Sequence, residues 1–83
     1  MEYLVTSPTQ LGQVARGVRK HRRQTQAQVA SRVGILQKAV SLFETDPTHS
    51  KVERLFQILS ALDLEVVLRD KQTSSGAMGA SDW

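Results

Sequence analysis

The chain has 83 residues, no cysteine and a net charge of +3 at neutral pH. A length that holds one small domain excludes most enzyme folds, because a catalytic cleft needs more scaffold than this. The lack of cysteine excludes disulfide bonds and cysteine-ligated zinc, and His21 and His49 do not have the spacing of metal ligands. No apolar run is long enough to cross a membrane, and the N-terminus lacks the pattern of a signal peptide. We therefore expect a cytoplasmic protein with no metal and no cofactor.

The charges divide unevenly along the chain. Residues 1–38 carry seven basic side chains and one acidic side chain, whereas residues 39–83 carry four basic and seven acidic ones. This asymmetry predicts two surfaces with different partners, and a basic half is typical of nucleic-acid binding. A solvated basic helix surface without a nucleic-acid partner is the alternative that composition leaves open.

The first predicted helix begins at Ser7-Pro8-Thr9-Gln10. The Ser7 hydroxyl can accept a hydrogen bond from the backbone amide of Gln10, and proline suits the first helical position. Apolar residues then recur at the helical spacing and extend the helix to about Arg22 or Arg23. These apolar residues are Leu11, Val14, Ala15 and Val18.

Two short helices are predicted next. Thr25-Gln26-Ala27-Gln28 has the residues of a capping box, so a second helix begins at about Gln26. Gly34 ends it, because glycine readily takes the left-handed conformation of a helix terminus. A third helix runs from Gln37 to Thr45, with Val40 and Phe43 facing inward, and the following Asp-Pro pair closes it.

The last predicted elements are a fourth helix and a strand. Ser50-Lys51-Val52-Glu53 has the residues of another capping box, and a helix with one apolar face follows. We expect that face to consist of Val52, Leu55, Phe56, Leu59 and Leu62. Residues 64–69 change to a near-alternating pattern that contains β-branched residues, which predicts a short strand. The alternative is that the fourth helix continues to Leu68.

A single strand leaves its backbone groups without partners. We therefore expect an antiparallel pair with the same strand of a second copy, in which Leu64, Val66 and Leu68 are buried. The small core favours such a homodimer, because a domain of this size seldom supplies more than about 3–5 kcal/mol of stability. The folded domain then spans residues 1–70, and residues 71–83, rich in Ser, Gly and Ala, form a flexible tail.

Residues 25–44 carry the most specific pattern of the chain. Two helices that cross at a steep angle need a small residue at the crossing, a glycine at the turn and a branched apolar residue on the second helix. Ala30, Gly34 and Val40 supply these three features in that order. The pattern predicts a DNA-binding helix-turn-helix, and a small helical protein-interaction domain is the alternative.

A helix-turn-helix places the N-terminal residues of its second helix over base edges in the major groove. We expect Gln37 to bind adenine and Lys38 to bind guanine or a phosphate. Gln26 lies at the start of the preceding helix, which suits a phosphate. The remaining predicted DNA-binding residues are Leu36, Ser41, Leu42 and Thr45. For Arg19 we favour a structural ion pair with Glu44 over a phosphate contact.

Several motifs together resemble one family. They are Ser7-Pro8-Thr9-Gln10-Leu11, Thr25-Gln26, Gly34-Ile35, Phe43-Glu44, Phe56-Gln57-Ile58-Leu59, the strand near residues 64–69 and the final Trp83. Residues 26–44 resemble the Cro/CI or XRE class of helix-turn-helix regulators, and the whole set resembles HipB-type antitoxins. The resemblance implies an all-α, lambda-repressor-like domain of four to five helices, with a short C-terminal β-strand that pairs across the two-fold axis of a dimer.

The resemblance also implies a function and not an enzyme. Proteins of this type bind palindromic operator DNA as dimers, repress their own operon, and hold a HipA-type serine/threonine kinase toxin inactive. Trp83 is then a candidate toxin contact. Leu36 and Lys38, on either side of Gln37, depart from the familiar pattern, so we expect a different operator sequence. The alternative is a stand-alone XRE-type repressor without a toxin partner.

Overall fold

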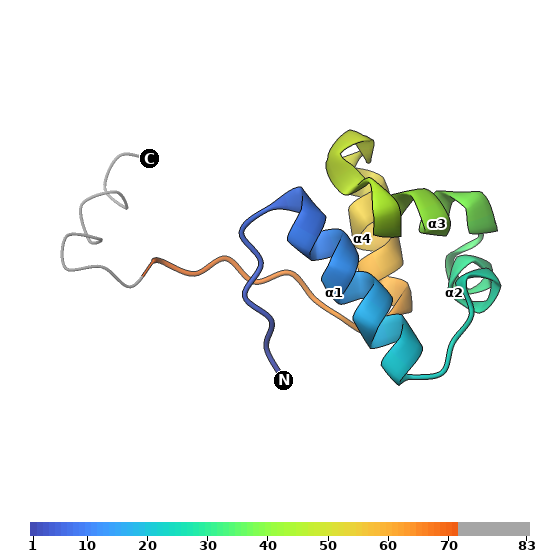
Figure 1. Ribbon diagram of the computed structural model, residues 1–83, viewed down its shortest axis with the longest axis horizontal. Coiled ribbons are helices and arrows are strands. Elements are labelled where there is room, and N and C mark those ends of the chain that lie inside the picture. Colours follow the sequence, from blue (N-terminus) through green and yellow to red (C-terminus); the bar gives the residue numbers. More distant parts are fainter. Residues whose placement is uncertain (72–83) are drawn as a thin grey trace.

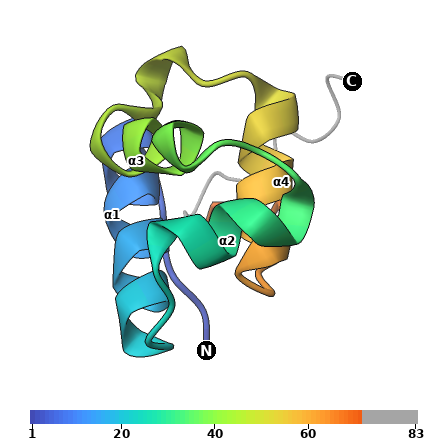
Figure 2. The same ribbon diagram turned by 90° about the vertical axis from the view of Figure 1, so that its right-hand side faces the viewer.

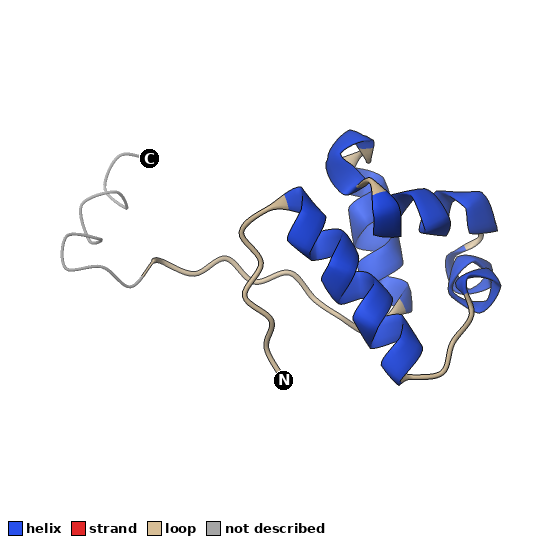
Figure 3. Ribbon diagram, in the orientation of Figure 1, coloured by secondary structure: helices blue, strands red, loops and turns tan. Residues whose placement is uncertain are grey.

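The structure is a computed structural model that describes residues 1–71. Four α-helices and a short 3-10 helix occur in this range: α1 (Pro8–His21), α2 (Gln26–Val33), α3 (Gln37–Thr45), η1 (Pro47–His49) and α4 (Val52–Ala61). α3 packs against α1 and α2, and α2 packs against α4, with α1 and α4 at the two sides (Figures 1 and 2). The described part of the chain is all-helical, as predicted (Figure 3).

The ends of the first three helices follow from local hydrogen bonds. The Ser7 hydroxyl accepts from the Gln10 amide at 3.2 Å, as the sequence predicts. Thr25 and Gln28 form the predicted reciprocal capping box, with distances of 3.0 and 2.8 Å. Gly34 ends α2 with φ at 69° and ψ at 34°, the left-handed conformation that glycine takes without strain.

The prediction for the start and the buried face of α4 is partly wrong. Lys51, not Ser50, is the N-cap, and no side chain caps the helix. Val52 and Phe56 are exposed, Phe56 by 53%. The buried stripe is instead rotated around the helix and consists of Leu55, Ile58, Leu59, Ala61 and Leu62. Both stripes have helical spacing, and contact with α2 selects the second one.

α1 and α3 approach most closely at Gly12. A β-carbon at this position would lie 2.7 Å from the Glu44 carbonyl oxygen and 2.9 Å from that of Phe43. Gly12→Ala is expected to lower the free energy of unfolding by about 1–3 kcal/mol, because the two backbones must separate. Gly17→Ala is the matched control, since nothing lies within 4 Å of its β-carbon. It is expected to raise the stability by about 0.5–1 kcal/mol in urea unfolding. Equal effects of the two variants would contradict this close approach.

α4 does not continue to Leu68. Its cap is Leu62, and Asp63 follows with φ at 58°, which turns the chain out of the helix. Residues 64–70 are then extended, and they form no ladder with any other part of residues 1–71. The N-terminal segment crosses them (Figure 1). The predicted strand therefore has no partner within this single chain, and most of the proposed tail lies outside the described residues. No helix within residues 1–71 is long and apolar enough to cross a membrane.

Candidate nucleic-acid interface

One face of α3 is open to solvent. The predicted DNA-binding residues of this helix recur at helical spacing, so they share that face. Ser41 is half-buried, and the other members, Gln37, Lys38, Leu42 and Thr45, are exposed together with Leu36 at the N-cap. Val40 and Phe43, on the opposite face, are fully buried. The core contacts of α3 therefore present the predicted recognition residues on one surface.

A buried ion pair joins α1 to the end of α3. Arg19 Nε lies 2.6 Å from Glu44 Oε2, and Arg19 Nη2 lies 3.1 Å from Glu44 Oε1. The two side chains are only 11% and 2% exposed. Arg19 Nη1 also donates to the backbone carbonyl of Gln24 at 2.9 Å. With all three nitrogens occupied inside the fold, Arg19 forms the structural pair that the sequence favours over a phosphate contact.

Gln26 connects this ion pair to the recognition surface. Its Nε2 donates to Glu44 Oε1 at 3.2 Å, and its Oε1 accepts from Gln37 Nε2 at 3.4 Å. The second bond is long, so it orients Gln37 weakly and can be exchanged for a bond to a base. Polar contacts thus run from the buried Arg19 to the first exposed residue of α3. The side chain of Gln26 has this inward role in addition to the predicted phosphate role.

Thr45 is less suited to a phosphate than its exposure suggests. Its hydroxyl donates to the backbone carbonyl of Ser41 at 3.0 Å. Phosphate oxygens accept hydrogen bonds, so Thr45 must give up this intrahelical bond before it can donate to DNA.

Sequence analysis missed a cation beside the recognition helix. A hollow of about 610 Å³ separates the N-terminal ends of α3 and α4. Lys38 lines it from α3, and Arg54 lines it from α4, with Leu36 and Leu42 at the α3 side. The pair of cations suits a phosphate beside the recognition surface. Arg54 had no distinguishing local signal, because only the tertiary fold brings the start of α4 next to α3.

A second missed feature is a pair of arginines at the C-terminal end of α4. Arg32 Nη1 donates to the carbonyl of Ala61 at 2.6 Å, and Arg22 Nη1 donates to the carbonyl of Leu62. Both guanidinium groups also lie near Asp63, at 3.5 and 3.8 Å. Two cations at a helix C-terminus satisfy carbonyls that have no partner in the helix. We call these two residues with Asp63 the arginine clamp.

The predicted dimerisation residues differ in their surroundings. Leu64 is half-buried against the core, and its amide donates to the Leu59 carbonyl at 2.8 Å. Val66 and Leu68 are 45% and 93% exposed. These two apolar side chains are therefore free for a partner in the single chain. Trp83, the candidate toxin contact, lies outside the described residues.

The chain was compared with known proteins. No family model matches it. It is 35% identical over 71 residues to the antitoxin HipB of Escherichia coli strain K12 and to that of Escherichia coli O6:H1 strain CFT073. The alignments cover 86% of this chain and 81% and 76% of these relatives.

Solved structures agree with these relatives. The chain superposes with a TM-score of 0.82 on HipB in a HipB–O4 20mer complex and on a chain of a HipA–HipB–O2–O3 complex. Each match has 34% identity and covers 86% of this chain and all of the other. The identity extends along most of the chain, and the helices superpose along with it, so this chain belongs to the HipB antitoxin family.

Proposed function

We propose that this chain is the antitoxin and transcriptional autorepressor of a HipBA-type toxin–antitoxin operon. It binds palindromic operator DNA as a cytoplasmic homodimer, binds a HipA-type kinase toxin, and has no enzymatic activity. The observation that supports this most directly is the open face of α3, on a fold that matches HipB in its operator complexes with a TM-score of 0.82. The same fold occurs in a complex that contains HipA.

The roles of the DNA-binding residues follow from their positions. Gln37 and Lys38 begin α3, so they are assigned to base edges in the major groove. Ser41 lies one turn further along the same face and is assigned to a base or phosphate. Leu36 and Leu42 are exposed apolar residues that suit the methyl groups of thymine.

The phosphate contacts are assigned to the flanking elements. Gln26 begins α2, where unpaired backbone amides also favour an anion. Arg54 lines the hollow beside Lys38, and we add it to the predicted set. Thr45 keeps a weaker phosphate role, because its hydroxyl is engaged within the helix.

Gln37→Ala is expected to weaken operator binding by about 1–3 kcal/mol and to relax the sequence preference at one base pair. The reason is that only a base-reading residue loses discrimination when it is truncated. Fluorescence anisotropy on the operator and on its single-base variants, at one fixed salt concentration, measures both quantities. Arg54→Ala is the matched control, expected to weaken binding to all of these sequences alike. A uniform loss for Gln37→Ala would assign it to positioning instead.

The antitoxin activity is tested by copurification. The full chain and a chain that lacks residues 81–83 are each coexpressed with the product of the adjacent gene. A stable complex with a kinase supports the antitoxin proposal. Loss of the complex on truncation supports a contact through Trp83, whereas retention assigns the interface to the folded domain. A failure of both chains to bind the kinase would leave a stand-alone XRE-type repressor.

A further inference from the structure

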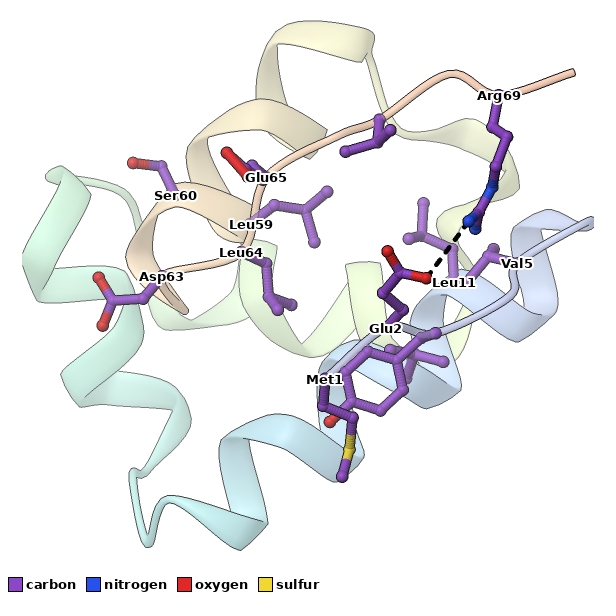
Figure 4. Close-up of a pocket in the computed structure, with 13 residues that line it drawn as sticks. Met1, Glu2, Val5, Leu11, Leu59, Ser60, Asp63, Leu64, Glu65 and Arg69 are labelled. Carbon is purple, nitrogen blue, oxygen red and sulfur yellow. Dashed lines mark hydrogen bonds and ion pairs between the residues drawn. The ribbon is translucent and has the colours of Figure 1, made fainter.

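The extended segment after α4 presents two different faces. Glu65, Val67 and Arg69 line a cavity of about 700 Å³, which Met1, Glu2 and Tyr3 enclose from the N-terminal segment (Figure 4). Val66 and Leu68 do not line this cavity and are exposed. This alternation is that of a strand, although the segment has no ladder within residues 1–71. The side chains are therefore already sorted onto the faces that strand pairing requires.

Two-fold symmetry restricts how two such segments can pair. Residues opposite each other in an antiparallel pair lie on the same face of the sheet, so the axis must pass beside a residue that meets its own copy. A pair centred on Val67 sets Glu65 opposite the partner's Arg69, and Asp63 opposite the partner's Lys71. The same contacts occur again at the other end, because the axis repeats them.

The neighbouring registers are less complementary. A pair centred on Val66 sets Glu65 opposite the apolar Val67 and retains one type of opposite-charge contact, Asp63 with Arg69. A pair centred on Leu68 sets Arg69 opposite Val67 and retains only Glu65 with Lys71. A pair centred on Glu65 brings two carboxylates together, which is unfavourable. Charge complementarity therefore favours the register centred on Val67.

We infer that two copies of this chain pair antiparallel about Val67, and that Glu65 with the partner's Arg69 selects a second copy of the same chain as partner. This inference rests on the proposed dimer and adds its register and its specificity. The N-terminal segment contributes, because Glu2 Oε1 lies 3.3 Å from Arg69 Nη1 (Figure 4). Arg69 then has a carboxylate on its own chain and another on the partner.

Reversing one charge at a time tests this pairing. E65R alone sets two arginines opposite each other at both ends of the pair, and R69E alone sets two glutamates opposite each other there. Both variants are expected to dimerise more weakly than the wild type. A mixture of the two variants removes these like-charge contacts, because each E65R chain then meets an R69E chain, so the heterodimer is expected in about tenfold excess over a statistical mixture. Native mass spectrometry of copies with different tags measures the three species.

The controls separate this inference from the proposed dimer. Glu65 and Arg69 are exposed in the single chain, so circular dichroism is expected to show an unchanged helical content for each variant. Loss of the Glu2 contact affects R69E equally with either partner and cancels from the comparison. E65R mixed with K71E is the matched control, because only the register centred on Leu68 favours that heterodimer. A statistical mixture of E65R and R69E, or a preference for K71E, would overturn the inference, and a monomeric wild type would overturn the dimer itself.

Discussion

Replacing Glu44 with alanine is expected to lower the free energy of unfolding by about 3–5 kcal/mol. The carboxylate is buried and accepts hydrogen bonds from two nitrogens of Arg19 and from Gln26. Alanine leaves the guanidinium of Arg19 inside the fold without an anion. A domain of this size has a total stability of only about 3–5 kcal/mol. Glu44→Ala is therefore expected to be largely unfolded at room temperature.

The double variant Arg19→Met/Glu44→Leu is the control for this result. It removes both charges and leaves apolar side chains in a buried site, so it is expected to recover most of the lost stability. Urea denaturation followed by circular dichroism compares the variants with the wild type. A Glu44→Ala variant as stable as the wild type would contradict a structural role for the pair and return Arg19 to the candidate phosphate ligands.

Val66→Asp is expected to convert the dimer into monomers. Val66 is 45% exposed in the single chain, so an aspartate is tolerated by the fold. In the proposed pair the same carboxylate would be placed against the partner's Leu68, where it loses water without gaining a cation. We expect the dimer dissociation constant to rise by a factor of about 100 or more, which corresponds to the cost of an unpaired buried charge. Sedimentation velocity measures the mass over a range of concentrations.

Val52→Asp is the control for that measurement. Val52 is also an exposed valine, and it lies in the first turn of α4, where an acidic residue is favourable. Its dimer mass is expected to match that of the wild type. Operator binding by Val66→Asp is expected to fall steeply as well, because a monomer reaches only one half-site of a palindrome. An unchanged mass for Val66→Asp would contradict pairing through the C-terminal segment.

The first three helices were predictable because their ends are local. Ser7, Thr25 and Gly34 act on backbone groups within a few residues of themselves, so the sequence alone specifies their partners. The buried face of α4 was not predictable in the same way. Residues 52–62 contain two overlapping apolar stripes, and the position of α2 decides which of them meets the core.

The candidate site divides along the same line. The open face of α3 follows from helical spacing once Val40 and Phe43 are assigned to the core, so the sequence predicted its members correctly as neighbours. The link from Gln26 to Glu44 spans 18 residues, and the bond from Arg22 to Leu62 spans 40. Such contacts depend on how the helices pack and carry no signature in local sequence.

The arginine clamp has a mechanical consequence for the proposed dimer. It holds Asp63 at the point where the chain leaves the folded body, so it fixes the angle between that body and residues 64–70. An extended arm of this length reaches about 20 Å from its pivot. A change of about 10° at Asp63 would then displace the partner by about 3.5 Å, close to one base-pair step. The spacing of half-sites that the dimer accepts is therefore set by a joint on the opposite end of α4 from the recognition surface.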